Sequence, residues 1–134
     1  QSYLKDSDLP KLEQLVVTKS WWDTVDILDR VVGSLVYEKQ ELEKIILQWS
    51  LSDNIWLRRV AIDHQLLRKE KTNVQLLEKI LLHNLNQTEF FINKAIGWAL
   101  RDYSKTNPTW VAGFIEKNKE RMAELSIKEA SKYL

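Results

Sequence analysis

Apolar residues recur along most of the chain at spacings of three and four positions, the repeat of one face of an α-helix. Few glycines and prolines interrupt this pattern, and the alternation typical of strands is absent. The spacing predicts an all-α fold with helices over about 8–17, 20–34, 38–50, 54–69, 73–84, 88–105, 108–118 and 126–133.

Several residues mark the starts of predicted helices. Pro108 suits a first turn, because its missing N–H would have no helical partner there. Ser20 and Thr88 are candidate N-caps. Ser126 and Glu129 match the capping box, in which each side chain satisfies a free backbone N–H of the other residue. The connections are short, so successive helices should pack as antiparallel neighbours.

The predicted helices form pairs with a period of about 35–40 residues, close to that of HEAT-like repeats. The pairs are 20–34 with 38–50, 54–69 with 73–84, and 88–105 with 108–118. Stacked pairs form a superhelix in which equivalent helices line one concave surface. We therefore expect residues 1–134 to form a single HEAT-like domain with a groove for an extended partner.

The overall composition limits the possible functions. Twenty Lys and Arg residues balance 19 Asp and Glu residues, so any DNA-binding surface must come from the placement of charges. The absence of cysteine and the presence of only two histidines predict no metal and no cofactor. No apolar run is long enough to cross a bilayer, so we expect a soluble, cytoplasmic protein without membrane contact. Because the chain begins at Gln1, we expect N-terminal helices of a longer protein to precede it.

Two adjacent tryptophans point to different sides of the predicted helix 20–34. Trp21 shares the apolar stripe with Val25, which indicates a core residue. Trp22 lies instead on the same stripe as Asp26, one turn later. The pattern therefore indicates either a site residue at Trp22 or an amphipathic ring at the edge of the core.

Arg59 occupies a shoulder of the predicted helix 54–69. The inward side is defined by Trp56, Val60 and Leu67, and the outward side by Arg58 and Gln65. A guanidinium on the shoulder lies partly over apolar surface, where it could hold a planar anion through two N–H bonds. The plainer alternative is an ion pair with Asp63, one turn later.

The helix 88–105 has the most informative faces. Its core side carries Ile92, Ala95, Ile96, Ala99 and Tyr103, and its opposite side carries Lys94, Trp98, Arg101 and Lys105. A tryptophan within a cationic stripe favours a partner with phosphates and with sugar or base surfaces. The alternative is a ring covered by the aliphatic stems of its basic neighbours. Gly97 would let either a neighbouring helix or the backbone of a ligand approach closely.

Trp22, Arg59 and Trp98 follow one another at nearly one repeat length. Equivalent positions in successive repeats line one surface of a superhelix. We therefore expect these three residues and Asp26 to converge on the concave side.

Three segments closely resemble the signature strings of the AlkD family of DNA alkylation-repair glycosylases. They are residues 19–26 (KSWWDTVD), 56–62 (WLRRVAI) and 91–108 (FINKAIGWALRDYSKTNP). The resemblance covers nearly the whole chain and ends in the segment 125–133. It identifies the chain as the C-terminal portion of such a protein.

The resemblance implies HEAT-like repeats that grip duplex DNA and excise bases of the 3-methyladenine and 7-methylguanine types. It implies that Trp22 and Trp98 contact the deoxyribose of the damaged nucleotide, that Asp26 is the catalytic carboxylate and that Arg59 holds the adjacent backbone. It also implies that the base stays stacked during excision, whereas most glycosylases extrude it. Lys94, Arg101 and Lys105 are the expected DNA-binding cations.

Two other functions remain open at this point. One is a DNA-structure binder of the same fold without catalysis, which would need only the cations of the groove. The other is a helical scaffold that binds proteins, which would carry an apolar groove. For the leading hypothesis, we expect a monomer whose partner is duplex DNA containing alkylated bases.

Overall fold

The computed structural model describes residues 10, 13 and 22–134, and their side chains at 10, 13 and 30–134. Pro10 and Glu13 are helical, and the rest of the predicted helix 8–17 lies outside the described residues, as do Ser20 and Trp21. The described helices are α2 (Trp22–Glu38), α3 (Glu43–Trp49), α4 (Ile55–Asp63), α5 (Val74–His83), α6 (Phe90–Ser104), α7 (Pro108–Asn118) and α8 (Glu124–Ala130). The described part of the chain contains no strand, which confirms the all-α class.

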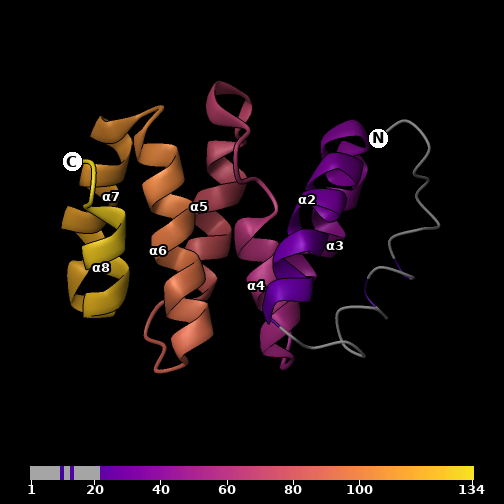
Figure 1. Cartoon of the computed structure of the whole chain (residues 1–134), viewed down its shortest axis with the longest axis horizontal. Helices are drawn as coiled ribbons and strands as arrows, with labels where there is room; N and C mark the ends of the chain where they lie inside the picture. The colour runs from indigo at the N-terminus through magenta and orange to yellow at the C-terminus, as the bar shows by residue number, and fades with distance from the viewer. Residues whose placement is uncertain (1–9, 11–12, 14–21) are drawn as a thin grey trace.

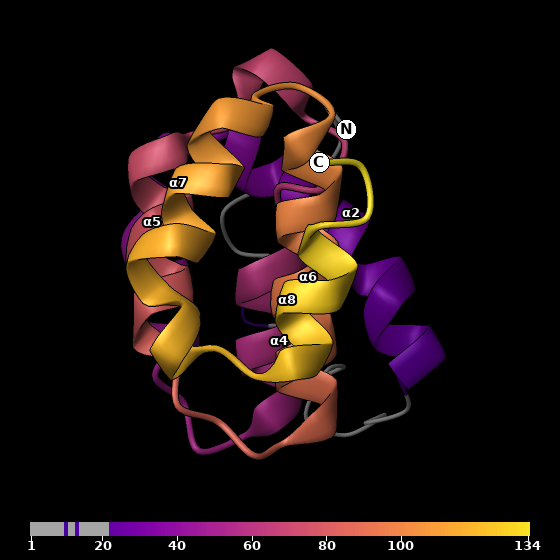
Figure 2. The ribbon, with the colours of Figure 1, turned by 90° about the vertical axis from the view of Figure 1, so that its left-hand side faces the viewer.

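The helices form two layers. In the first layer, α2 packs against α4, α4 against α6, and α6 against α8. Helices α5 and α7 lie on the other side of this row, and α3 contacts α5 (Figures 1 and 2). The helices of the pairs α2 and α3, α4 and α5, and α6 and α7 thus belong to different layers. The HEAT-like assignment of these pairs stays a prediction.

The core lies between the two layers. Each helix contributes an apolar stripe that is removed from water, with fully buried residues such as Val32, Ile46, Val60, Ile80 and Ile96. Burying one such side chain stabilises the fold by about 1.5–3 kcal/mol. None of the described helices combines the length and the apolar character needed to cross a bilayer.

Two glycines allow close approach between helices of the first layer. A Cβ atom on Gly33 of α2 would overlap the carbonyl oxygen of His64 at the end of α4. A Cβ atom on Gly97 of α6 would lie 2.7 Å from Cβ of Glu129 in α8. The close approach of a neighbouring helix at Gly97 is therefore confirmed. Gly33 permits a second close approach, between α2 and the end of α4. Helix α2 itself continues four residues beyond its predicted end.

Asparagine side chains cap three of the described helices. Asn54, Asn73 and Asn107 each accept backbone N–H bonds at the starts of α4, α5 and α7. Pro108 occupies the first turn of α7, as predicted. The prediction that Thr88 is an N-cap is wrong. The N-cap of α6 is Glu89, whose side chain makes no capping hydrogen bond.

The capping box predicted at Ser126 and Glu129 is also wrong. Helix α8 starts earlier, after Ala123, so both residues lie inside it. The Ser126 hydroxyl donates instead to the carbonyl of Asn93 at 2.7 Å. Both side chains therefore face α6 and attach α8 to it.

Helix α4 ends at Asp63, six residues before its predicted end. Beyond it, Leu67 and Lys69 have left-handed backbones with φ of 70° and 57°. Leu67 is therefore exposed instead of pointing inward. Gln65, expected to point outward, is buried because its amide bonds the backbone N–H and carbonyl of Asn73.

Candidate nucleic-acid interface

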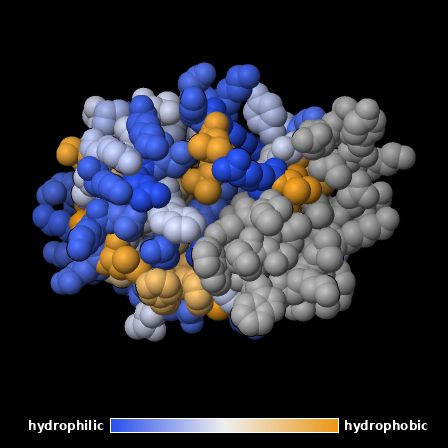
Figure 3. Space-filling model, in the orientation of Figure 1, coloured by the Kyte–Doolittle hydropathy of each residue, from blue (hydrophilic) through white to orange (hydrophobic). Residues whose placement is uncertain are grey.

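Helix α6 has the two faces that its sequence predicts. The five residues expected on the core side are all buried: Ile92, Ala95, Ile96, Ala99 and Tyr103. On the opposite side, Lys94, Trp98 and Arg101 are half-buried and Lys105 is exposed. Figure 3 looks onto the layer of α2, α4, α6 and α8, where hydrophilic residues prevail over α6 and α8.

The structure brings Arg59 of α4 against the aromatic side chains of α6. The central carbon of its guanidinium lies 5.2 Å from the ring centre of Trp98 and 5.9 Å from that of Phe91. Nη1 donates to the carbonyl of Phe91 at 2.9 Å. Arg59 is only 1% exposed, so it is much less accessible than a position on a helix shoulder predicts, and it contacts α6.

An aromatic pocket of about 340 Å³ opens beside this contact and is lined by Arg59, Phe90, Phe91, Lys94 and Trp98. Nζ of Lys94 lies 5.6 Å from the ring centres of both Phe90 and Trp98. The cations therefore lie against ring faces, where aromatic quadrupoles attract them. The charged ends of Lys94 and Arg59 lie near the Trp98 ring, and the ring still borders the pocket.

Trp98 also borders a second hollow of about 210 Å³, between α2, the end of α4 and α6. Arg30 contributes from α2, Leu67 from the loop after α4, and Arg101 and Lys105 from α6. Trp98 thus lies between two openings, and the second one is bordered by three basic residues.

A third hollow of about 260 Å³ shares Arg30 and Leu67 with the second and adds Tyr37, His64 and Arg68. Arg68 donates to the carbonyl of Gly33 at 2.6 Å and lies 5.1 Å from the ring centre of Tyr37. Burial lowers the pKa of Arg68, against the attraction of Glu43. We call these three hollows, neighbours of which share lining residues, the basic groove.

His64 is a buried neutral side chain at the edge of the basic groove. Its pKa is lowered from 6.5 to about 3, mainly by burial and also by the nearby Arg68, against a backbone hydrogen bond that raises it. That bond runs from Nδ1 to the carbonyl of Ala61 at 2.7 Å. Because a carbonyl only accepts, Nδ1 carries the proton of the neutral ring.

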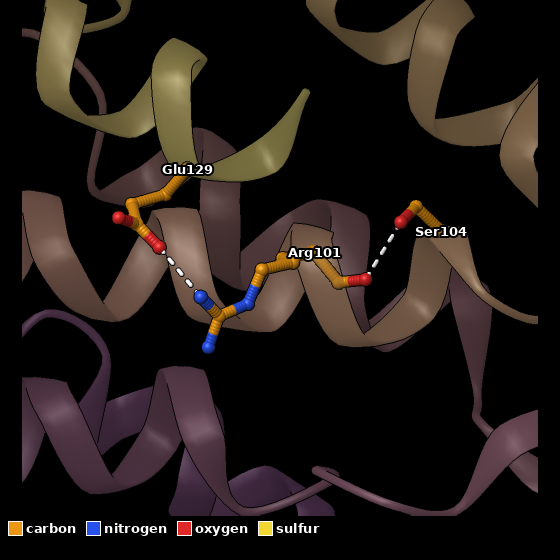
Figure 4. Close-up of polar contacts among 3 residues, drawn as sticks. All are labelled: Arg101, Ser104 and Glu129. Carbon is orange, nitrogen blue, oxygen red and sulfur yellow. Dashed lines mark hydrogen bonds and ion pairs between the residues drawn. The ribbon is translucent and has the colours of Figure 1, made fainter. Parts of the chain in front are cut away.

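Two expected DNA-binding cations already have contacts within the protein. Nη1 of Arg101 lies 2.7 Å from Oε1 of Glu129, and Ser104 donates to the Arg101 carbonyl (Figure 4). Nζ of Lys105 lies 5.1 Å from the ring centre of Tyr133. Glu129 therefore neutralises part of the positive charge along α6.

Trp22 and Asp26 lie in α2, but their side chains are outside those that the structure describes. The backbone of α2 places Asp26 one turn before Arg30, on the same stripe of the helix. Of the expected four-residue cluster, the structure brings Arg59 and Trp98 together.

Several lining residues were not predicted from the sequence: Phe90, Phe91, Arg30, Tyr37 and Arg68. A signal existed only for Arg30, which continues the stripe of Trp22 and Asp26. Phe90 and Phe91 come before the basic stripe of α6 in the sequence. They line the pocket because α4, which carries Arg59, packs against α6.

Comparison with known proteins gives a consistent result. A model of the family described as DNA alkylation repair enzyme matches residues 1–134. A solved structure, described as a predicted DNA alkylation repair enzyme from Enterococcus faecalis, is 39% identical with a TM-score of 0.90. The match covers 99% of this chain and 62% of that chain. No curated protein matches the chain.

Proposed function

The chain belongs to the family of DNA alkylation repair enzymes, and from this premise we propose that it is a DNA glycosylase. Its substrates would be cationic alkylated bases of the 3-methyladenine and 7-methylguanine types in duplex DNA. The family expected from residues 19–26, 56–62 and 91–108 is confirmed. The observation that carries the proposal is Trp98, an aromatic face between two openings of a basic groove.

The basic groove supplies the charge that a DNA backbone requires. Arg30, Arg101 and Lys105 border the hollow beside Trp98, and Lys94 borders the pocket on the other side. Cations in these positions would neutralise phosphates and release counterions. We infer that the helical pairs are HEAT-like repeats whose first helices face the DNA, and that the protein acts as a monomer.

The proposed chemistry needs few groups. A base methylated on a ring nitrogen already carries positive charge and leaves readily, so no general acid is required. The carboxylate of Asp26 and the faces of Trp22 and Trp98 would stabilise the positive charge that develops on the sugar. Asp26 would also orient the attacking water. This arrangement acts from the backbone side and leaves the base stacked.

Arg59 would support this site in two ways. Its contacts with the Trp98 ring and the Phe91 carbonyl fix the indole at the edge of the pocket. The guanidinium also lines the pocket, where, because Arg59 is only 1% exposed, its charge would attract the backbone beside the damaged nucleotide without direct contact.

The test is single-turnover excision of 7-methylguanine from duplex DNA by the purified protein and by Asp26→Asn. The substitution removes the charge and keeps the size, so we expect a rate about a hundredfold lower. Affinity for undamaged duplex should stay equal or rise slightly, because a carboxylate near phosphates repels them. Asp53→Asn, an exposed residue before α4 that lines none of the three hollows, is the control and should keep the wild-type rate.

Other outcomes would decide against the proposal. Equal rates in wild type and Asp26→Asn would exclude Asp26 as the catalytic carboxylate. DNA binding without release of the base would make the protein a non-catalytic binder. Absence of DNA binding would favour a protein-binding scaffold.

A further inference from the structure

An apolar side chain projects from the middle of the basic groove. Leu67 is 53% exposed and lies in the loop after α4, between the second and third hollows. Its φ of 70° is a left-handed conformation that leucine rarely adopts. An exposed leucine and a strained backbone are both unfavourable for an isolated protein. Strained backbone conformations cluster at functional sites.

Hydrogen bonds hold the Leu67 loop in place. The N–H of Leu67 donates to Oδ2 of Asp102 in α6 at 2.9 Å. Arg68, the next residue, donates to the carbonyl of Gly33 in α2 and to Oε1 of Gln65. The loop is thus attached to α2 and α6, the helices on both sides of α4. The backbone that carries the exposed side chain is therefore held in position.

Leu67 lies between two groups of mainly basic residues. Arg30, Arg101 and Lys105 border the second hollow together with Asp102, and Arg30 and Arg68 border the third. Among the described residues, Arg30 and Lys105 form no ion pair. A DNA strand has the complementary pattern, because an apolar sugar face lies between successive phosphates.

We propose that Leu67 is a positioning residue that contacts a deoxyribose of one DNA strand, with the flanking phosphates in the second and third hollows. This inference rests on the proposed function and deepens it. The contact fixes where the strand lies along the groove, and Trp98, which borders the second hollow, then faces the neighbouring nucleotide. Leu67 acts through DNA placement and takes no part in the chemistry.

The decisive variant is Leu67→Gly, which removes the side chain and suits the left-handed backbone. We expect its melting temperature to equal or exceed that of wild type. Its affinity for undamaged duplex should fall about tenfold, the effect of losing one buried apolar contact. The dependence of log affinity on log salt should keep the wild-type slope, because no phosphate contact is removed. Leu67→Met keeps an apolar side chain and should restore the affinity.

Two matched variants complete the test. Leu51→Gly removes another exposed leucine, from the turn after α3, and should not change DNA affinity. Lys105→Ala should reduce the salt slope by about one unit, which shows that the assay detects a lost phosphate contact. Wild-type affinity in Leu67→Gly, a reduced slope or a lowered melting temperature would each overturn the role of Leu67. Absence of duplex binding by the wild-type protein would overturn the proposed function as well.

Discussion

A guanidinium that is almost fully buried needs partners that replace water, and Arg59 has them on α6. The rings of Phe91 and Trp98 lie within 6 Å of its central carbon, and a carbonyl accepts one of its N–H groups. Such contacts are favourable by about 0.5–2 kcal/mol, and more when water is excluded. The orientation of Trp98 is thus coupled to the packing of α4 against α6.

The sequence predicts which residues share one face of a helix. It does not predict which of them a neighbouring helix buries. Lys94, Trp98 and Lys105 share one side of α6 because helix geometry alone places them there. The same geometry gives the direction of Arg59 on α4 but not the neighbouring helix that covers it. The pocket residues Phe90 and Phe91 were missed for the same reason.

His64 makes stability depend on pH. Its pKa of about 3 in the folded protein lies below its ordinary value of 6.5, so the unfolded chain binds more protons between these values. Stability is therefore full above about pH 6.5 and decreases as the pH falls. At pH 5 we expect a loss of about 2 kcal/mol in the free energy of unfolding relative to pH 7. Urea denaturation of wild type at the two pH values measures this difference.

The control for this prediction is His64→Gln, which removes the titrating group. The difference between pH 5 and pH 7 should shrink by most of the expected 2 kcal/mol, whatever the absolute stability of the variant. His83→Gln retains His64 and controls for the loss of one histidine. Equal pH dependence in wild type and His64→Gln would contradict the assignment.

At the scale of elements, helix interiors were predictable and several of their ends were not. Apolar periodicity located every described α-helix, and Pro108 marked the start of α7. The end of α4 had no local signal, because a leucine does not favour a left-handed backbone. The bond from the Leu67 N–H to Asp102 comes from α6 and is visible only in three dimensions.

Gly97 lies at the contact between α6 and α8, whereas Gly113 lies on an open side of α7, so we expect Gly→Ala substitutions at the two positions to have opposite effects on stability. In Gly97→Ala, the new methyl group would press on Glu129, and we expect a loss of about 1–3 kcal/mol in stability. In Gly113→Ala, the methyl group points into open space on α7, and we expect a gain of about 0.5–1 kcal/mol. Urea denaturation compares the two variants with wild type. Equal stabilities of the two variants would show that α8 does not pack on Gly97 as described.

For the whole molecule, the basic groove depends on the order of the helices in the first layer. Helix α2 supplies Arg30, the end of α4 supplies Leu67, and α6 supplies Trp98 with its basic neighbours. The balanced total charge of the chain conceals this local concentration. Two acids reduce this positive charge, because Asp102 lines the second hollow and Glu129 pairs with Arg101.

Glu129 is the acid whose removal should strengthen DNA binding. Its carboxylate holds Arg101 at 2.7 Å, with both side chains a quarter or more exposed. In Glu129→Gln the guanidinium of Arg101 loses its acidic partner, so its full positive charge becomes available to a phosphate. Near 0.1 M salt we expect affinity for undamaged duplex to rise up to about tenfold, with the salt slope steeper by about 0.9. Stability should fall by no more than about 1 kcal/mol, as for exposed ion pairs.

Two comparisons identify the cause of such a gain. Glu116→Gln breaks a similar ion pair, with Lys119 at 3.3 Å, on α7 in the other layer, and should leave DNA affinity unchanged. In an Arg101→Ala background, Glu129→Gln should lose most of its effect, because the released cation is no longer present. A gain that persists in that background would mean that Glu129 repels DNA directly, with no role for Arg101. Unchanged affinity and slope in the single variant would place Arg101 outside the DNA interface and restrict the phosphate contacts to Arg30, Lys94 and Lys105.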